Sequence, residues 1–201
     1  MQIEERTIRD FLDSLAAKTP TPGGGAVAAL LAALSAALAQ MVLNYSVGKK
    51  SLVQHEAINR AALESLDRHA AGALQLAQAD AAAYARLNDL LKKPDGDSQR
   101  TRDLPAAVQS AIDAPHQVVR IAVEILHQLQ NLCGTTNTML KSDLAIAAII
   151  ADAAARAAAW NVRINLPLLN DASAVANLES QISGSLRTAA TMCREIEQNC
   201  E

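Results

Sequence analysis

Apolar residues recur at helical spacing along most of the chain, and no alternating strand pattern of any length occurs. One apolar face predicts a helix over residues 3–17, which Pro20 and Pro22 terminate. An almost uninterrupted apolar run predicts a second helix over residues 24–46. The longest amphipathic pattern predicts a third helix over about 50–91, before the turn-forming segment KKPDGDS.

Prolines and polar residues divide the second half of the chain into further helices. Pro105 suits the first turn of a short helix, and a second proline opens a helix expected over residues 115–132. Ser142 is predicted to cap a helix that begins at Asp143, whose charge favours a helix start. A last amphipathic helix is expected over residues 171–198. These patterns indicate an all-α protein.

Composition sharpens the expected fold class. Half of the residues are hydrophobic (50%), but Ala dominates and only 2% are aromatic. Ala is the best helix former, and its small side chain lets helices approach closely. No linker or exact repeat interrupts the sequence, so we expect residues 1–201 to form a single-domain antiparallel bundle of long Ala-rich helices. Because Ala buries little area per residue, we also expect a homodimer with helices at the interface.

Charge and apolar pattern exclude two classes of protein. The net charge is −3, no basic stripe occurs and aromatic residues are few, so we expect no nucleic-acid partner. Residues 26–47 carry no charge and are long enough to cross a membrane, but Ser35, Gln40 and Asn44 interrupt them. We therefore expect a buried central helix and no membrane partner.

The cysteines and histidines favour a cytoplasmic protein without a metal site. The three cysteines form no CxxC pair and their number is odd, which is typical of reduced thiols. The four histidines have no His or Cys neighbour at metal-ligand spacing. The charged N-terminal segment MQIEERTIRD lacks the order of a signal peptide.

The clearest candidate for ligand binding is the triple glycine Gly23, Gly24 and Gly25, directly before the apolar helix. Ligands can approach glycine amides closely, and the first turn of the helix adds unpaired N–H groups and a positive dipole end. Together these suit a carboxylate, a phosphate or a developing negative charge. A tight turn packed under a neighbouring helix explains the glycines equally well. Lys49 and Lys50, after this helix, would bind an anionic tail or remain solvated.

Asp80 is the candidate acid or base. Alanines surround it in the segment LAQADAAAYARL, so we expect partial burial, which raises the pKa of a carboxyl group. Tyr84 lies one turn further on the same helix face. The alternative is an aspartate on the solvated edge of the helix.

A second polar set flanks the apolar helix in the second half of the chain. Its members are Asn137, Ser142, Asp143, Asn161 and Asn165. Asn161 and Asn165 share a face if the helix continues through them. Helix capping and helix termination explain these residues about as well as ligand binding does.

Five segments of the chain, in the same order, resemble the signature of the formiminotetrahydrofolate cyclodeaminase and methenyltetrahydrofolate cyclohydrolase family. They are FLDSLAAKTPTPGGGAVAAL, VGKK, ADAAAY, NTMLKSDLAIAA and NVRINL. The resemblance covers most of the chain. It implies an all-helical domain that dimerises, with folate bound near helix termini and subunit contacts.

The resemblance also implies chemistry at the one-carbon unit carried between N5 and N10 of tetrahydrofolate. It implies no metal and no cofactor beyond the tetrahydrofolate-linked substrate. The catalytic aspartate of the family falls on Asp80. The substrate-binding positions that it implies are Gly23, Gly24, Gly25, Lys49, Lys50, Tyr84, Asn137, Asp143, Asn161 and Asn165.

Three departures from the family pattern bear on the reaction. Ala26 stands where the family usually has Ser, and Gln78 where some relatives carry a second acid. Ser51 and Leu52 follow the GKK stretch, where an aromatic residue is common. The choice between cyclohydrolase and cyclodeaminase therefore stays open. The missing hydroxyl at Ala26 also supports an alternative, a non-catalytic helical dimer that binds folate or a partner subunit.

Overall fold

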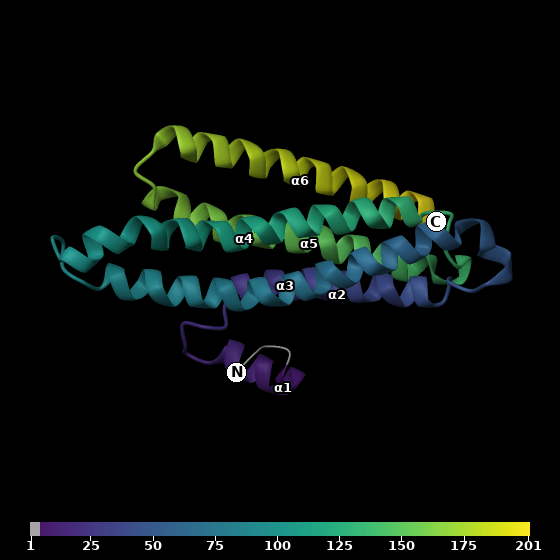
Figure 1. Cartoon of the computed structure of the whole chain (residues 1–201), viewed down its shortest axis with the longest axis horizontal. Coiled ribbons are helices and arrows are strands. Elements are labelled where there is room, and N and C mark those ends of the chain that lie inside the picture. Colours follow the sequence, from purple (N-terminus) through teal and green to yellow (C-terminus); the bar gives the residue numbers. More distant parts are fainter. Residues whose placement is uncertain (1–4) are drawn as a thin grey trace.

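Four long helices form the body of the protein (Figure 1). The computed structural model describes residues 5–201, and every regular element in that range is a helix. The four are α2 (Gly24–Asn44), α3 (Glu56–Leu91), α4 (Ser98–Leu132) and α5 (Lys141–Asn165). Consecutive helices pack against each other, and α5 returns to pack against α2. The four helices thus close a bundle, which confirms the expected all-α class.

Small side chains allow α2 and α5 to approach closely. Fully buried alanines line the inner sides of both helices: Ala28, Ala29, Ala32, Ala36 and Ala39 in α2, and Ala147, Ala148, Ala151, Ala154, Ala155 and Ala158 in α5. The buried hydroxyl of Ser35 donates a hydrogen bond of 2.7 Å to the carbonyl of Ala147 and joins the two helices. Larger residues such as Ile125 and Leu126 of α4 fill the rest of the core.

Helix α6 (Ala172–Cys200) lies along the outside of α4 and α5 (Figure 1), close to the predicted range. The side chain of Asp171 caps it by accepting two N–H groups of its first turn. Arg163 of α5 donates to both carboxylate oxygens of Glu179 of α6, with a shortest distance of 2.7 Å. This ion pair fixes α6 near the C-terminal end of α5.

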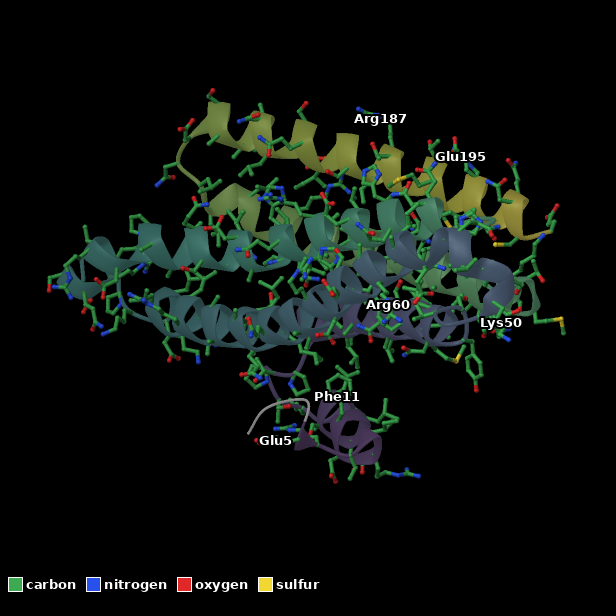
Figure 2. All side chains as sticks on the ribbon, turned by 45° about the vertical axis from the view of Figure 1, so that its right-hand side comes forward. Glu5, Phe11, Lys50, Arg60, Arg187 and Glu195 are labelled. Carbon is green, nitrogen blue, oxygen red and sulfur yellow. The ribbon has the colours of Figure 1, made fainter. Side chains whose placement is uncertain are left out.

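Helix α1 (Ile8–Ala16) lies beside the bundle rather than within it (Figure 1). It begins after Thr7, whose hydroxyl accepts the N–H of Asp10, so the predicted start at residue 3 is too early. Residues 3 and 4 lie outside the described range. Phe11 points from α1 towards the bundle (Figure 2) and is buried, which anchors the helix.

Helix α4 runs without interruption through Pro105 and Pro115, so the predicted break between two shorter helices is wrong. Each proline removes one intrahelical hydrogen bond and costs a helix interior about 3 kcal/mol. Buried residues on both sides of Pro115, including Ile112 and Val118, hold the helix in the core. Burying one such side chain is worth about 1.5–3 kcal/mol, so several together outweigh the proline.

Two other predicted helix starts also differ from the structure. Residues Lys50–His55 form a 3₁₀ helix, η2, and α3 begins only after it. A second 3₁₀ helix, η3 (Thr138–Leu140), runs directly into α5, so Ser142 is not the cap. The polar cap in this region is Asn137, whose side chain accepts the N–H of Met139 at 3.3 Å.

The helix α2 and the segment Thr138–Leu168 are each long and apolar enough to cross a membrane, judged by length and composition alone. Both belong to the walls of the bundle, and 56% of the apolar window in α2 is buried there. Helix α2 therefore has the buried inner side expected of a core helix, whereas its outer side is part of the surface.

Candidate functional site

A cavity of about 290 Å³ lies where α2 begins. Helix α2 has 21 residues, whereas α3 has 36 and α4 has 35, so both continue past the start of α2 (Figure 1). Pro20 and Thr21, in the loop before α2, form one wall of the cavity. The other walls come from the first turn of α2 and from α3, α4 and α5.

Asp80 projects from α3 against the first turn of α2. A Cβ atom built on Gly25 would overlap the Asp80 carboxylate, so only glycine permits this close approach. The Asp80 side chain is partly buried, and burial raises its pKa above the ordinary value for an aspartate. The site thus holds a carboxyl group that can gain or lose a proton closer to neutral pH.

Helix α5 continues through Asn161 and Asn165, so the two share a helix face, as their spacing predicted, and both line the cavity. The amide nitrogen of Asn161 donates to the carbonyl of Ala157 at 3.1 Å, and its oxygen faces Gly24. The amide nitrogen of Asn165 donates to the carbonyls of Ala111 and Asn161, each at 3.0 Å. Within the described residues, neither side-chain oxygen accepts a hydrogen bond, so both asparagines offer acceptors to a ligand.

Apolar and aromatic groups complete the rim of the cavity. Tyr84 lies one turn after Asp80 on α3 and is exposed at the cavity. Ile164 lies between the two asparagines in sequence and is 74% exposed, which leaves its side chain available for contact. Among residues 5–201, no three His, Cys, Asp or Glu side chains gather as metal ligands. The polar groups of the cavity suit an organic ligand with a cationic or hydrogen-bond-donating ring.

Four of the predicted ligand-binding residues lie elsewhere in the chain: Lys49, Lys50, Asn137 and Asp143. They gather around the opposite end of α2, which is about 30 Å from its start at 1.5 Å per residue. The N–H of Asn137 donates to the Ser46 hydroxyl at 2.9 Å, which joins the two loops at that end. Figure 2 shows Lys50 at this end of the bundle. One chain therefore does not bring these residues to the Asp80 cavity.

Other residues of the cavity were not predicted from the sequence. Ala81 follows Asp80 directly, and Ile164 stands within the NVRINL segment, so both were near a recognised motif. Ala111 is remote from every motif. The signal that could have found it is Pro115, four residues further along α4, because a proline leaves the carbonyl of the residue four positions earlier without its helical donor.

A sequence model of the formiminotransferase-cyclodeaminase family matches residues 7–184, which include every residue of the cavity. The chain belongs to this family. The two residues expected from the resemblance to depart from the family pattern lie in different places. Ala26 is buried in a wall of the cavity. Gln78 lines a smaller neighbouring cavity, together with Arg6.

Relatives within the formiminotransferase-cyclodeaminase family are named for two reactions. A methenyltetrahydrofolate cyclohydrolase of Methylorubrum extorquens is 30% identical over 194 residues, which cover 94% of this chain and 93% of that protein. A formimidoyltransferase-cyclodeaminase of Rattus norvegicus is 29% identical over 191 residues, but the chain spans only 35% of that protein. The crystal structure of a formiminotetrahydrofolate cyclodeaminase from Thermotoga maritima aligns with a TM-score of 0.84 at 27% identity, over 99% of this chain and 96% of that one.

Proposed function

We propose that the protein acts on the one-carbon unit between N5 and N10 of tetrahydrofolate, as a methenyltetrahydrofolate cyclohydrolase or a formiminotetrahydrofolate cyclodeaminase. The names of the relatives support this substrate class. The observation that carries the proposal is the partly buried Asp80 carboxylate at the start of α2. A soluble protein fits these relatives, and the cytoplasm is its proposed compartment.

Asp80 provides the charge that this chemistry requires. Both reactions pass through methenyltetrahydrofolate, whose five-membered ring holds a delocalised positive charge. A carboxylate beside that ring stabilises the charge, and the low dielectric of a partly buried site strengthens the effect. Asn161 and Asn165 line the same cavity, and because their amide nitrogens already donate to backbone carbonyls, their side-chain oxygens can add two further partial negative charges.

Asp80 also moves protons. In the cyclohydrolase reaction, water attacks the methenyl carbon, and Asp80 passes one proton of that water to the ring nitrogen that departs, while the second proton is released to solvent as the formyl group forms. In the cyclodeaminase reaction, N10 attacks the protonated formimino group, and Asp80 carries the N10 proton to the nitrogen that departs as ammonia. Neither reaction needs a cofactor beyond the tetrahydrofolate-linked substrate.

A second copy of the chain is the proposed partner. The outer sides of α2 and α5 carry many exposed or half-exposed apolar residues, which together we call the α2/α5 face; the exposed Arg156 of α5, paired with Asp152 at 2.9 Å, lies beside it. Its residues are Val27, Leu30, Leu31, Leu34, Ala37, Leu38, Met41 and Tyr45 of α2, and Ile146, Ile149, Ile150, Ala153, Ala157, Trp160 and Ile164 of α5. Soluble monomers rarely expose so extended an apolar patch, so pairing of two such faces supports a homodimer.

The dimer also accounts for the distant lysines. The Asp80 cavity lies at one end of the α2/α5 face, and Lys49 and Lys50 lie near the other. If two faces pack about a twofold axis across the helices, Lys49 of the partner subunit comes near the cavity. There its ammonium group would bind the anionic glutamate tail of folate.

The absorbance of methenyltetrahydrofolate distinguishes the candidate functions. Loss of this absorbance on adding the protein identifies a cyclohydrolase. A gain of absorbance from formiminotetrahydrofolate, together with release of ammonia, identifies a cyclodeaminase. If neither substrate reacts, the catalytic proposal is wrong, and the alternative of a non-catalytic helical dimer that binds folate or a partner subunit takes its place.

A further inference from the structure

The side-chain amide of Asn165 is tied to two helices at once. One of its N–H groups donates to the carbonyl of Ala111 in α4, and the other donates to the carbonyl of Asn161 in α5, each at 3.0 Å. Both donors of the amide are therefore used. The oxygen Oδ1 is the one polar atom of this side chain left to face the cavity, and it can act there only as an acceptor.

The carbonyl of Ala111 is free to accept this bond because of Pro115. In a regular α-helix it would accept the N–H of residue 115, but a proline has no N–H. Ala111 is buried in the cavity wall, where an unpaired carbonyl would be costly. The Asn165 amide supplies the missing donor, so the proline in α4 determines what the asparagine in α5 binds.

We propose that Pro115 is a positioning residue for the substrate. By leaving the Ala111 carbonyl free, it holds the Asn165 amide in one orientation, in which Oδ1 accepts a hydrogen bond from an N–H group of the substrate heterocycle. Pro115 is buried and does not line the cavity, so it acts only through Asn165. The part of this inference that concerns the substrate rests on the proposed folate activity, whereas the link between Pro115 and Asn165 does not.

The link is tested by replacing each proline of α4 with alanine. Pro115→Ala restores an N–H group that competes for the Ala111 carbonyl. The matched control is Pro105→Ala in the same helix, because Pro105 is exposed and the carbonyl that it frees, that of Thr101, lies outside the cavity. Nuclear magnetic resonance of the Asn165 side-chain amide should show slow hydrogen exchange in the wild type and in Pro105→Ala, and fast exchange in Pro115→Ala. Equal exchange in all three proteins would overturn the link.

Kinetics test the role in substrate binding. A lost hydrogen bond to a group remote from the reacting carbon should raise KM, lowering kcat/KM about three- to tenfold with little change in kcat. Pro105→Ala should match the wild type, and Pro115→Ala should have no further effect in an Asn165→Ala background. Unchanged KM in Pro115→Ala, or multiplicative losses in the double variant, would overturn the positioning role. An inactive wild type would overturn the proposed function, and the exchange rates would still decide the link.

Thermal unfolding separates this role from a general effect on stability. Replacing a proline inside a helix removes a strain on that helix, so Pro115→Ala should unfold at the same temperature as the wild type or higher. A loss of activity together with unchanged or raised stability supports positioning. A loss of activity that appears only with a lower unfolding temperature identifies Pro115 as a structural residue and overturns the proposal.

Discussion

Gly25 is the position at which one added carbon atom should abolish most of the activity. A Cβ built there overlaps Cγ and both oxygens of Asp80, so Gly25→Ala must push the carboxylate away from α2. The matched control is a glycine away from the cavity. A Cβ on Gly72 of α3 lies 3.4 Å from Cδ1 of Ile121, which is an ordinary contact, and Gly72→Ala leaves Asp80 in place.

The expected magnitudes separate catalysis from stability. A positioned acid or base typically contributes about 10²–10⁴ in rate, so Gly25→Ala should lower turnover at least about a hundredfold. Ala stabilises a helix by about 0.5–1 kcal/mol relative to Gly, whereas overpacking costs about 1–3 kcal/mol. The net loss in the free energy of unfolding is then at most about 2.5 kcal/mol. A domain of ordinary stability, about 5–15 kcal/mol, remains folded after such a loss.

The assay is turnover of the folate substrate, with thermal unfolding measured on the same samples. Gly25→Ala should be folded and nearly inactive, and Gly72→Ala should stay close to the wild type. Combining Gly25→Ala with Asp80→Asn should be no worse than Asp80→Asn alone, because both act on the same carboxylate. Wild-type turnover in Gly25→Ala, or an equal loss in Gly72→Ala, would refute the reasoning.

Three further predictions test the other parts of the proposal. Asp80→Asn should keep the fold and lose at least about a hundredfold in turnover. Because burial raises the pKa of Asp80, the activity of the wild type should fall as the pH is lowered, and this fall should begin at a higher pH than an ordinary aspartate would give. The residual activity of Asp80→Asn should not show this fall. Lys49→Ala should raise KM more than it lowers kcat, and unchanged constants would identify a solvated lysine. Ile149→Glu should convert the proposed dimer to monomers in sedimentation, whereas Arg187→Glu on exposed α6 should not; a dimer in both variants would exclude the α2/α5 face.

The all-α class could be predicted from the sequence because the spacing of apolar residues and the Ala content favour a helix within each short segment. Helix boundaries could not always be predicted, since distant contacts decide them. Pro105 and Pro115 both look like helix starts, yet burial of one side of α4 carries the helix through each of them. Ser142 has the chemistry of a cap, but η3 leads straight into α5 and leaves it no capping role.

Candidate site residues were predictable where a motif or an unusual local setting marked them. Asp80 stands out among alanines, and its place beside the triple glycine then follows from the antiparallel packing of α2 and α3. The contact between Gly25 and Asp80 and the bond from Asn165 to Ala111 join residues far apart in sequence, so no local pattern reveals them. The distance of Lys49 from the cavity follows from the length of α2.

The alanine contact between α2 and α5 has a consequence for the choice of ligand. Each of these helices is continuous, and one carries Gly25 while the other carries Asn161, so the row of small side chains between them sets how wide the cavity is. A bulkier residue at Ala154, buried in that row, would wedge the two walls apart without altering any group that lines them. The size of ligand that the cavity accepts thus depends in part on residues that do not contact the ligand.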